Sequence, residues 1–86
     1  MSNRIHITAL STGDTLFERD AEYLRLPLED GRIGVLANHA PMLCALGEGE
    51  LYCRDDRGEG FSFHIDGGVA RVESNSVRLL IPTEEK

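Results

Sequence analysis

The chain has 86 residues, of which 41% are hydrophobic and 28% charged, and it carries a formal net charge of −6 at pH 7. This length excludes a multi-domain enzyme, and the composition is that of an ordinary globular protein, not of a disordered or low-complexity tail. The acidic balance argues against nucleic-acid binding, because most faces of such a molecule would repel a phosphate backbone.

Hydrophobic and polar residues alternate in short runs that are separated by turn residues, a pattern typical of β-strands. The first run is Ile5–Leu10, and weaker ones follow at Thr15–Arg19 and Glu22–Leu26. Pro27 cannot donate a ladder hydrogen bond, so we expect it at a strand end or a sheet edge. The stretch Glu29–Arg32 then predicts a turn, with a glycine available for a positive φ.

Two apolar runs, Ile33–Leu36 and Met42–Leu46, flank a loop at residues 37–41. Runs this unbroken predict strands that are buried on both faces. Alternation resumes around Leu51 and Cys53 and stops at residues 55–60, which are too polar and glycine-rich for anything but a hairpin loop.

The cleanest alternation is at Phe61–Ile65, which would give the core one aromatic-rich face. The glycine pair at 67–68 marks a bend or a bulge. Val69–Glu73 and Val77–Ile81 predict a last hairpin around residues 74–76, and Pro82 ends the final strand.

Together these runs predict an all-β fold. We expect a two-sheet antiparallel β-sandwich of about eight to ten short strands, eight or nine of which are visible as separate runs. Residues 1–82 are assigned to the sandwich domain and residues 83–86 to a short C-terminal tail. No apolar stretch approaches the roughly 20 residues that span a bilayer, and the first residues lack the apolar run of a secretion signal, so we expect the protein to stay where it is made.

The residues that most often carry chemistry are not arranged for it. Cys44 and Cys53 are nine positions apart, and His6, His39 and His64 fall in three different runs, so the spacing disfavours a zinc site. A thiol nucleophile formed by the second histidine and the first cysteine would need a third, orienting group that the spacing does not supply. Both cysteines are expected to be reduced. No glycine-rich phosphate cradle precedes a helix. We therefore predict no catalytic residue, no metal and no cofactor.

The block from Gly31 to Leu46, GRIGVLANHAPMLCAL, is the most distinctive part of the chain. It resembles the signature of the epsilon subunit of F-type rotary ATP synthases, called delta in mitochondria, in which Gly-x-x-Gly-x-Leu/Tyr-x-x-His-Ala-Pro leads into an apolar strand. The stretches GEGEL at 47–51, DGGVARV at 66–72 and NSV at 75–77 also resemble that family. The resemblance covers nearly the whole chain, in matching order.

The chain departs from the family pattern at three places. Ala37 and Asn38 stand where the family usually has Pro-Gly, although asparagine also tolerates a left-handed backbone. Glu48 replaces a proline that is usual in its turn. Full-length members continue into a C-terminal helical hairpin, whereas four residues follow Pro82 here and cannot form a helix. We therefore expect this chain to lack the inhibition of ATP hydrolysis and the ATP binding for which the family uses that hairpin.

The resemblance implies a non-catalytic rotor subunit of the central stalk. It would couple the gamma subunit to the polar loops of the membrane c-ring during proton- or sodium-driven ATP synthesis. It would lie peripherally at the cytoplasmic face of the bacterial inner membrane and meet the membrane only through the ring. Such a coupling role needs a rigid fold and broad contacts, not a reactive group.

Family position marks the turn at 29–32 and the loop at 38–41 as the segments that face the ring and gamma. From composition alone, a solvated turn and a satisfied histidine would be the simpler explanation. Ring loops in these enzymes carry a basic residue, so acidic side chains in the turn would be complementary to them. Exposed apolar residues should mark the sheet face or edge that meets gamma. The interface candidates are Glu29, Asp30, Arg32, Asn38, His39 and Pro41.

Two other hypotheses remain open at this point. The chain could be the sandwich half of a naturally split or truncated protein, or a short epsilon from an alternate ATPase operon. It could instead be a small stand-alone β-sandwich that binds a ligand or a metal through His39 and its neighbours.

Overall fold

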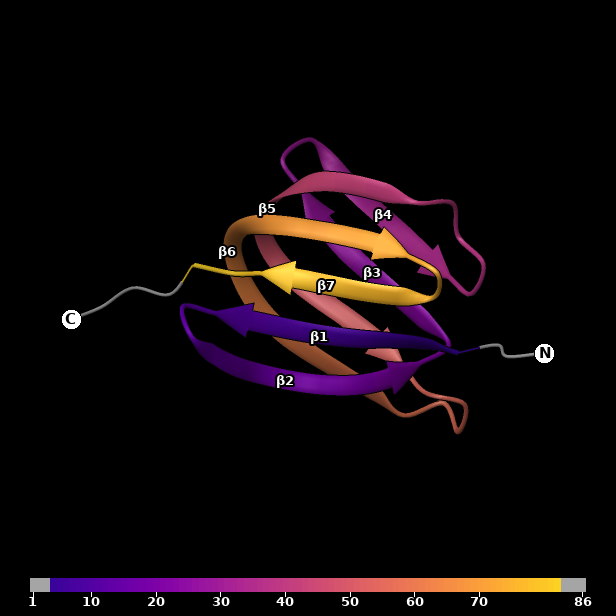
Figure 1. Ribbon diagram of the computed structural model, residues 1–86. Helices are drawn as coiled ribbons and strands as arrows, with labels where there is room; N and C mark the ends of the chain where they lie inside the picture. Colours follow the sequence, from indigo (N-terminus) through magenta and orange to yellow (C-terminus); the bar gives the residue numbers. More distant parts are fainter. Residues whose placement is uncertain (1–3, 83–86) are drawn as a thin grey trace.

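The computed structural model describes residues 4–82, which form seven β-strands (Figure 1). Hydrogen bonds join the strands in the order β2-β1-β7-β6-β5-β3-β4. Neighbouring strands are antiparallel except for β1 and β7, which run parallel. Within this part of the chain there is thus no helix long and apolar enough to cross a membrane. The strands are β1 (Ile5–Ser11), β2 (Asp14–Ala21), β3 (Tyr23–Leu28), β4 (Gly31–Leu36), β5 (Met42–Arg54), β6 (Gly60–Glu73) and β7 (Ser76–Leu80).

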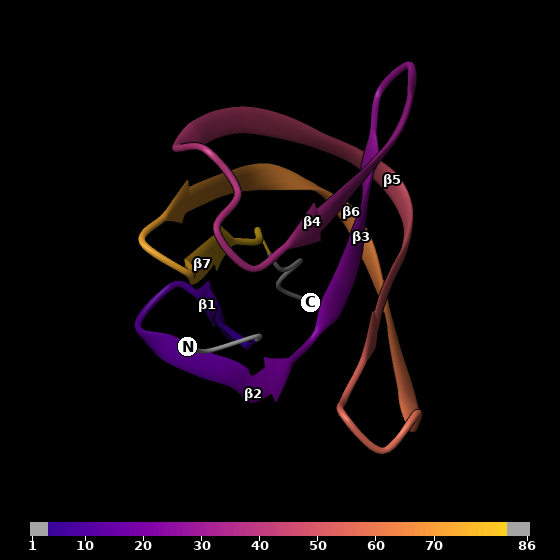
Figure 2. The ribbon, with the colours of Figure 1, turned by 90° about the vertical axis from the view of Figure 1, so that its right-hand side faces the viewer.

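The sheet folds over on itself because its two long strands, β5 and β6, bend in the middle (Figure 2). Residues 42–46 of β5 and 69–73 of β6 continue through β7 and β1 to β2, and we call this half layer 1. Residues 50–54 of β5 and 60–65 of β6 continue through β3 to β4, and we call this half layer 2. The two layers therefore share two continuous strands.

The bend reverses which side of each long strand faces inward. Leu46 and Leu51 of β5 are both buried, as are Ile65 and Ala70 of β6, although each pair is separated by an odd number of positions. In a regular strand such residues would point to opposite faces. The reversal lets one strand contribute to the inner surface of both layers.

Glycines make this reversal possible. Gly67 has a φ of 95° and Gly68 a φ of 128°, in the region that favours glycine. A side chain at Gly68 would also collide with the backbone carbonyl of Leu80. The β5–β6 register is the same on both sides, with Leu46 opposite Gly68 and Glu48 opposite Asp66. The sequence predicted a bend or a bulge at this glycine pair, and the structure has a bend without a bulge.

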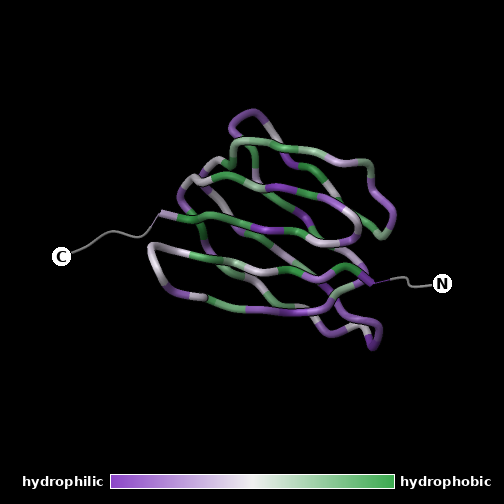
Figure 3. Tube along the Cα trace, in the orientation of Figure 1, coloured by the Kyte–Doolittle hydropathy of each residue, from purple (hydrophilic) through white to green (hydrophobic). Residues whose placement is uncertain are grey.

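The core lies between the layers and takes buried side chains from every strand. Figure 3 shows the alternation of hydrophobic and hydrophilic residues along the strands that produces it. On the side away from the bend, Phe17 of β2 packs edge-to-face on Phe61 and Phe63 of β6, with ring centroids 5.1 and 5.0 Å apart. This aromatic cluster closes the edge of layer 1 onto layer 2. The largest fully buried side chains are Ile5, Ile7, Leu24, Leu26, Leu51, Ile65, Leu79, Val35, Val72 and Val77.

The predicted all-β sandwich is confirmed, but the strand count and one pairing differ. The runs at 42–46 and 50–54 are one strand, as are those at 61–65 and 69–73, so seven strands replace the predicted eight to ten across residues 4–82. Glycines between these runs bend the strand without ending it. The expectation of purely antiparallel sheets was wrong for β1 and β7.

The expectation that the two apolar runs are buried on both faces was also wrong. Leu36 is 58% exposed and Leu43 is 71% exposed, so β4 and the first half of β5 each have an outward apolar residue. The predicted polar loop at 55–60 is present at 55–59, because Gly60 already belongs to β6. Asp55 Oδ1 caps the loop by accepting hydrogen bonds of 2.9 Å from the backbone N–H groups of Arg57 and Glu59. The predicted tail at 83–86 lies outside the described residues.

Replacing Gly68 by alanine should strongly destabilise the fold, because the new methyl group meets the Leu80 carbonyl and the backbone conformation becomes strained. We expect the free energy of unfolding to fall by about 3 kcal/mol or more. Gly13→Ala is the control, because Gly13 has a φ of 76° but open space around it, and it should cost only about 1–2 kcal/mol. Urea denaturation of both variants measures the difference. Equal losses would contradict the role given to the bend.

Candidate docking surfaces

The turn between β3 and β4 is a two-residue tip. Leu28 pairs with Gly31 across the hairpin, which leaves Glu29 and Asp30 as the connection. Gly31 has a φ of 154° and supplies the glycine conformation that the turn requires. Both acidic residues are exposed, as is Arg32 at the start of β4. The sequence-predicted turn is therefore confirmed, and its two carboxylates are accessible to a cationic partner.

The loop at residues 37–41 lies at the other end of β4 and is held against the β6–β7 turn. The backbone N–H of Asn38 donates to Oδ1 of Asn75, and Nδ2 of Asn75 lies 3.5 Å from Oδ1 of Asn38. The carbonyl of Asn75 also accepts a 2.9 Å hydrogen bond from the backbone N–H of His6. Asn38 has a φ of 68°, so it adopts the left-handed backbone that asparagine tolerates. These bonds fix the loop on the sandwich.

His39 is half-buried in this loop and turned toward its own backbone. Its ring nitrogen Nδ1 lies 2.8 Å from the carbonyl oxygen of Ala40 and donates to it. Burial raises the pKa of the Cys44 thiol, which opposes formation of a nucleophilic thiolate there. Within residues 4–82, no three histidine, cysteine, aspartate or glutamate side chains are arranged to hold a metal ion. His39 is thus part of a structured loop with an exposed proline, Pro41, beside it.

The structure divides the sequence-predicted candidates into two groups. The six residues of β4 separate them, a distance of roughly 20 Å at the usual rise of a strand. The candidates therefore lie at opposite ends of β4 and do not form one cluster. The groups are Glu29, Asp30 and Arg32 at one end, and Asn38, His39 and Pro41 at the other.

A third surface lies on the outward side of layer 1. The sequence predicts an exposed apolar face but does not identify its residues. Ala45, Val69, Leu80 and Leu10 are aligned by the strand registers into one row across β5, β6, β7 and β1. Val69 is 42% and Leu80 58% exposed. Consecutive apolar residues in the run at 42–46 and at 79–81 were the signal for it, because in a strand some of them must point outward.

Leu43 extends this apolar surface toward the loop at 37–41. It is 71% exposed, lies two positions beyond Pro41, and occupies the row next to the one that contains Val69. We call the surface formed by this loop and the outward side of layer 1 the layer 1 face. Contiguous exposed apolar side chains of this kind mark sites of protein–protein contact.

At the far end of the layer 1 face, His6 lies between two carboxylates. Its Nδ1 is 2.7 Å from Oδ1 of Asp20, and its Nε2 is 3.1 Å from Oε2 of Glu18. The hydrogen bond to Asp20, and then that to Glu18, raises the pKa of His6. Because the ring separates the carboxylates, their oxygens do not converge on one point as metal ligands would.

The outward side of layer 2 differs, because its large side chains cover one another. The guanidinium of Arg25 lies 5.1 Å from the Tyr52 ring centroid, and that of Arg54 lies 5.1 Å from the Tyr23 ring centroid. The two tyrosine rings are 6.3 Å apart. Each cation thus faces a ring within the chain. Leu36 of β4 is 58% exposed on this side, whereas the layer 1 face has three exposed large apolar residues, Leu43, Val69 and Leu80.

Comparison with known proteins agrees with this fold and with the sequence resemblance. Residues 4–86 match the family described as ATP synthase, delta/epsilon chain, beta-sandwich domain. The ATP synthase epsilon chain of Thermosynechococcus vestitus is 36% identical over 80 residues, which are 93% of this chain and 57% of that protein. The epsilon chain of Alkalilimnicola ehrlichii is 32% identical over 79 residues, 92% of this chain and 56% of that protein. The chain thus spans a little over half the length of these relatives.

A solved structure supports the fold independently. A chain in the Euglena gracilis mitochondrial ATP synthase structure, which contains OSCP, F1 and the c-ring, superimposes with a TM-score of 0.86 at 22% identity. The match covers 94% of this chain and 52% of that chain. At this identity the likeness establishes the sandwich fold alone.

Replacing His6 by glutamine should destabilise the protein more at low pH than at high pH. Because the pKa of His6 is higher in the folded chain, the protonated ring stabilises the fold. This stabilisation is fully present below the pKa of the unfolded chain, near 6.5, and is lost as the pH rises through the pKa of the folded chain. The loss caused by His6→Gln should therefore be larger at about pH 5.5 than at about pH 8.5. Thermal or urea unfolding at both pH values measures it.

The matched control for this pH dependence is the same substitution in an Asp20→Asn/Glu18→Gln background. Without the carboxylates, the loss caused by His6→Gln should be equal at the two pH values. If His6→Gln costs the same stability at both pH values in the protein that keeps Asp20 and Glu18, these carboxylates do not raise the pKa of His6.

Proposed function

The chain belongs to the family of ATP synthase delta/epsilon β-sandwich domains, and we propose that it is a non-catalytic central-stalk subunit of a rotary F-type ATP synthase. In this role it joins the gamma subunit to the polar loops of the membrane c-ring during proton- or sodium-driven ATP synthesis. It lies peripherally at the cytoplasmic face of the bacterial inner membrane and meets the membrane only through the ring.

The observation that supports this proposal most is that an exposed acidic turn and an exposed apolar face lie on different parts of one continuous sheet. A part that transmits rotation has to hold two neighbours without deforming between them. The two layers share β5 and β6, and the acidic turn and the layer 1 face lie on different parts of this framework. Torque applied at one surface thus passes to the other through continuous strands.

The layer 1 face is assigned to gamma. Its uncovered side chains Leu43, Val69 and Leu80 offer apolar area in a fixed arrangement, and a stable interface buries about 1,200–2,000 Å² in total, counted over both partners. The loop at 37–41 adds polar groups at the rim of this area. An apolar centre with a polar rim is the usual organisation of a protein interface.

The turn at Glu29 and Asp30 is assigned to the c-ring. Its two exposed carboxylates form the tip of a hairpin that extends from layer 2 (Figure 1). Contact with basic side chains in the ring loops would steer the encounter and fix the orientation of the docked subunit. Arg32, which follows the tip, would bind a carbonyl or a carboxylate in the same loops.

Replacing both Glu29 and Asp30 by lysine should weaken assembly onto the ring, because like charges would then face each other, while the isolated domain stays folded. The measurement is the yield of ring that co-purifies with the tagged chain from native membranes. Asp56→Lys/Glu59→Lys is the matched control, with the same charge change at the exposed tip of the β5–β6 hairpin. An intact rotor at unchanged yield, with normal ATP synthesis, would refute the assignment.

Replacing Leu43 by aspartate should weaken binding to gamma at least about 10-fold, because a charge is placed in the apolar centre of the contact. Leu43 is 71% exposed in the free chain and faces Arg71 across the strands, so the aspartate variant should stay folded, with a melting temperature no lower than that of the original chain. Ser62→Asp adds the same charge on the outward side of layer 2 and should leave the affinity as it is. Calorimetric titration with purified gamma measures both. Unchanged affinity for the Leu43 variant would show that gamma binds elsewhere.

A further inference from the structure

Two arginines lie directly opposite each other on the layer 1 face, next to the apolar row of Val69 and Leu80. Arg71 of β6 pairs in register with Arg78 of β7, and both are exposed. Like charges at directly opposite positions of an antiparallel pair destabilise the sheet. The chain as a whole carries a charge of −6, so this pair is a local concentration of positive charge on an acidic protein.

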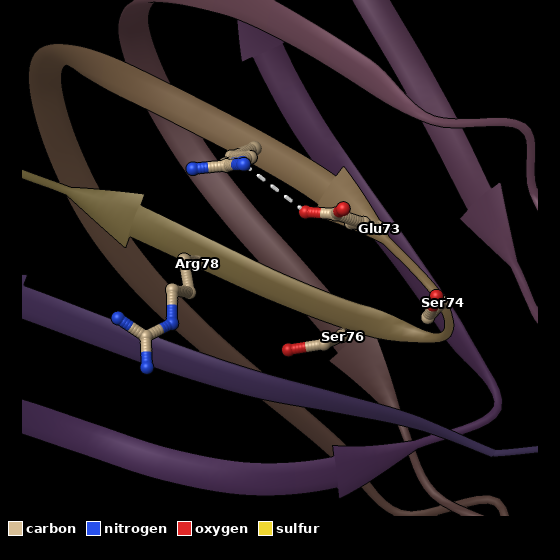
Figure 4. Close-up of a pocket in the computed structure, with 5 residues that line it drawn as sticks. Glu73, Ser74, Ser76 and Arg78 are labelled. Atoms are coloured by element: carbon tan, nitrogen blue, oxygen red, sulfur yellow. Dashed lines mark ion pairs between the residues drawn. The ribbon is translucent and has the colours of Figure 1, made fainter.

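The carboxylates on the same face do not neutralise this pair. Nη2 of Arg71 forms a 3.2 Å ion pair with Oε1 of Glu73, marked by the dashed line in Figure 4. Glu18 and Asp20 are both bound to His6. Arg78 forms no ion pair with any residue in the range 4–82. One guanidinium of the pair therefore remains available for a carboxylate from outside the chain.

A shallow hollow accompanies the arginines. It is lined by Arg71, Glu73, Ser74, Ser76 and Arg78, at the end of the β6–β7 hairpin. Figure 4 shows the side chains of Ser76 and Arg78 coming from β7, with Arg78 directed toward β1 and away from the ion pair on β6. The serine hydroxyl groups add hydrogen-bond donors next to the guanidinium groups.

The surroundings of the arginines indicate a protein side chain as their ligand. Leu43 of β5 is the register neighbour of Arg71. Val69 lies two positions from Arg71 on β6, and Leu80 lies two positions from Arg78 on β7. A partner that covers these apolar residues also removes water from Arg78. An uncompensated buried cation is costly, so such a partner has to supply an acceptor at this point.

We propose that Arg78, the register neighbour of Arg71, binds an aspartate or glutamate side chain of the gamma subunit beside the apolar row of the layer 1 face. The inference rests on the proposed function and adds to it the chemistry of the recognised group. A carboxylate can form two parallel hydrogen bonds with one guanidinium, and charge-assisted bonds of this kind are stronger than neutral ones. Specificity for gamma would then come from the position of its acidic residue, and affinity from Leu43 and from the apolar row of Val69 and Leu80 on one side.

The first test is the affinity of the Arg78→Glu variant for the gamma subunit encoded with this chain. We expect binding to weaken at least about 10-fold, because two carboxylates would meet in a water-poor contact. Arg57→Glu is the matched control, since Arg57 is exposed in the β5–β6 loop, and its affinity should stay within about 2-fold of the original. Circular dichroism confirms that both variants fold.

The second test identifies the partner residue. Each exposed aspartate and glutamate of gamma is replaced by arginine in turn, and one replacement should restore binding to the Arg78→Glu variant. That same replacement should weaken binding to the unchanged chain. If no replacement does so, the proposed pairing is wrong.

The outcomes separate this inference from the proposed function. If Leu43→Asp abolishes binding while Arg78→Glu leaves it unchanged, gamma docks on the layer 1 face without a carboxylate at the arginines. The inference is then wrong, while the proposed function stands. If neither variant changes the affinity, the docking face itself is wrong. If both variants lose binding and a charge-reversed gamma restores binding to the Arg78→Glu variant, the inference and the proposed function are both supported.

Discussion

The architecture depends on the bend that β5 and β6 make together at their glycines. Because the inward side of both strands changes there, one continuous pair of strands lines the core in both layers. Gly68 tolerates the bend since it has no side chain to meet the Leu80 carbonyl, and its φ of 128° suits glycine. A sandwich built in this way has covalent continuity between its layers, in addition to packing, which suits a part that has to transmit force.

This rigid framework gives its two outward sides different properties. On layer 2, the rings of Tyr23 and Tyr52 and the guanidinium groups of Arg25 and Arg54 cover one another. On layer 1, apolar side chains stay uncovered, and the arginine pair is only half neutralised. Leu36 is also exposed on layer 2, but Leu43, Val69 and Leu80 give layer 1 more uncovered apolar residues for a partner to bind. The asymmetry therefore follows from the residues at outward positions of an otherwise regular sheet.

Much of this fold can be predicted from local patterns, and the exceptions have physical reasons. Alternation at 5–10 and 61–65 identifies strands directly, and the turn at 29–32 follows from its polar residues. The merging of two runs into β5 is not visible, since a glycine within a strand resembles a turn. The parallel contact of β1 with β7 joins distant segments and leaves no local signal. For the site, family position marks the acidic turn and the loop at 38–41, whereas the strands of the layer 1 face are identified only when the registers bring Leu43, Arg71 and Arg78 into one row.

The most direct test of the central claim, that one rigid sandwich connects two partners through two separate surfaces, is a cryo-EM structure of the assembled rotor that contains this chain. We expect gamma to cover the outward side of layer 1 around Leu43, the c-ring loops to contact the tip at Glu29 and Asp30, and the sandwich to keep its free conformation. A structure in which gamma instead covers the tyrosines of layer 2, or in which the acidic tip contacts nothing, would contradict this account.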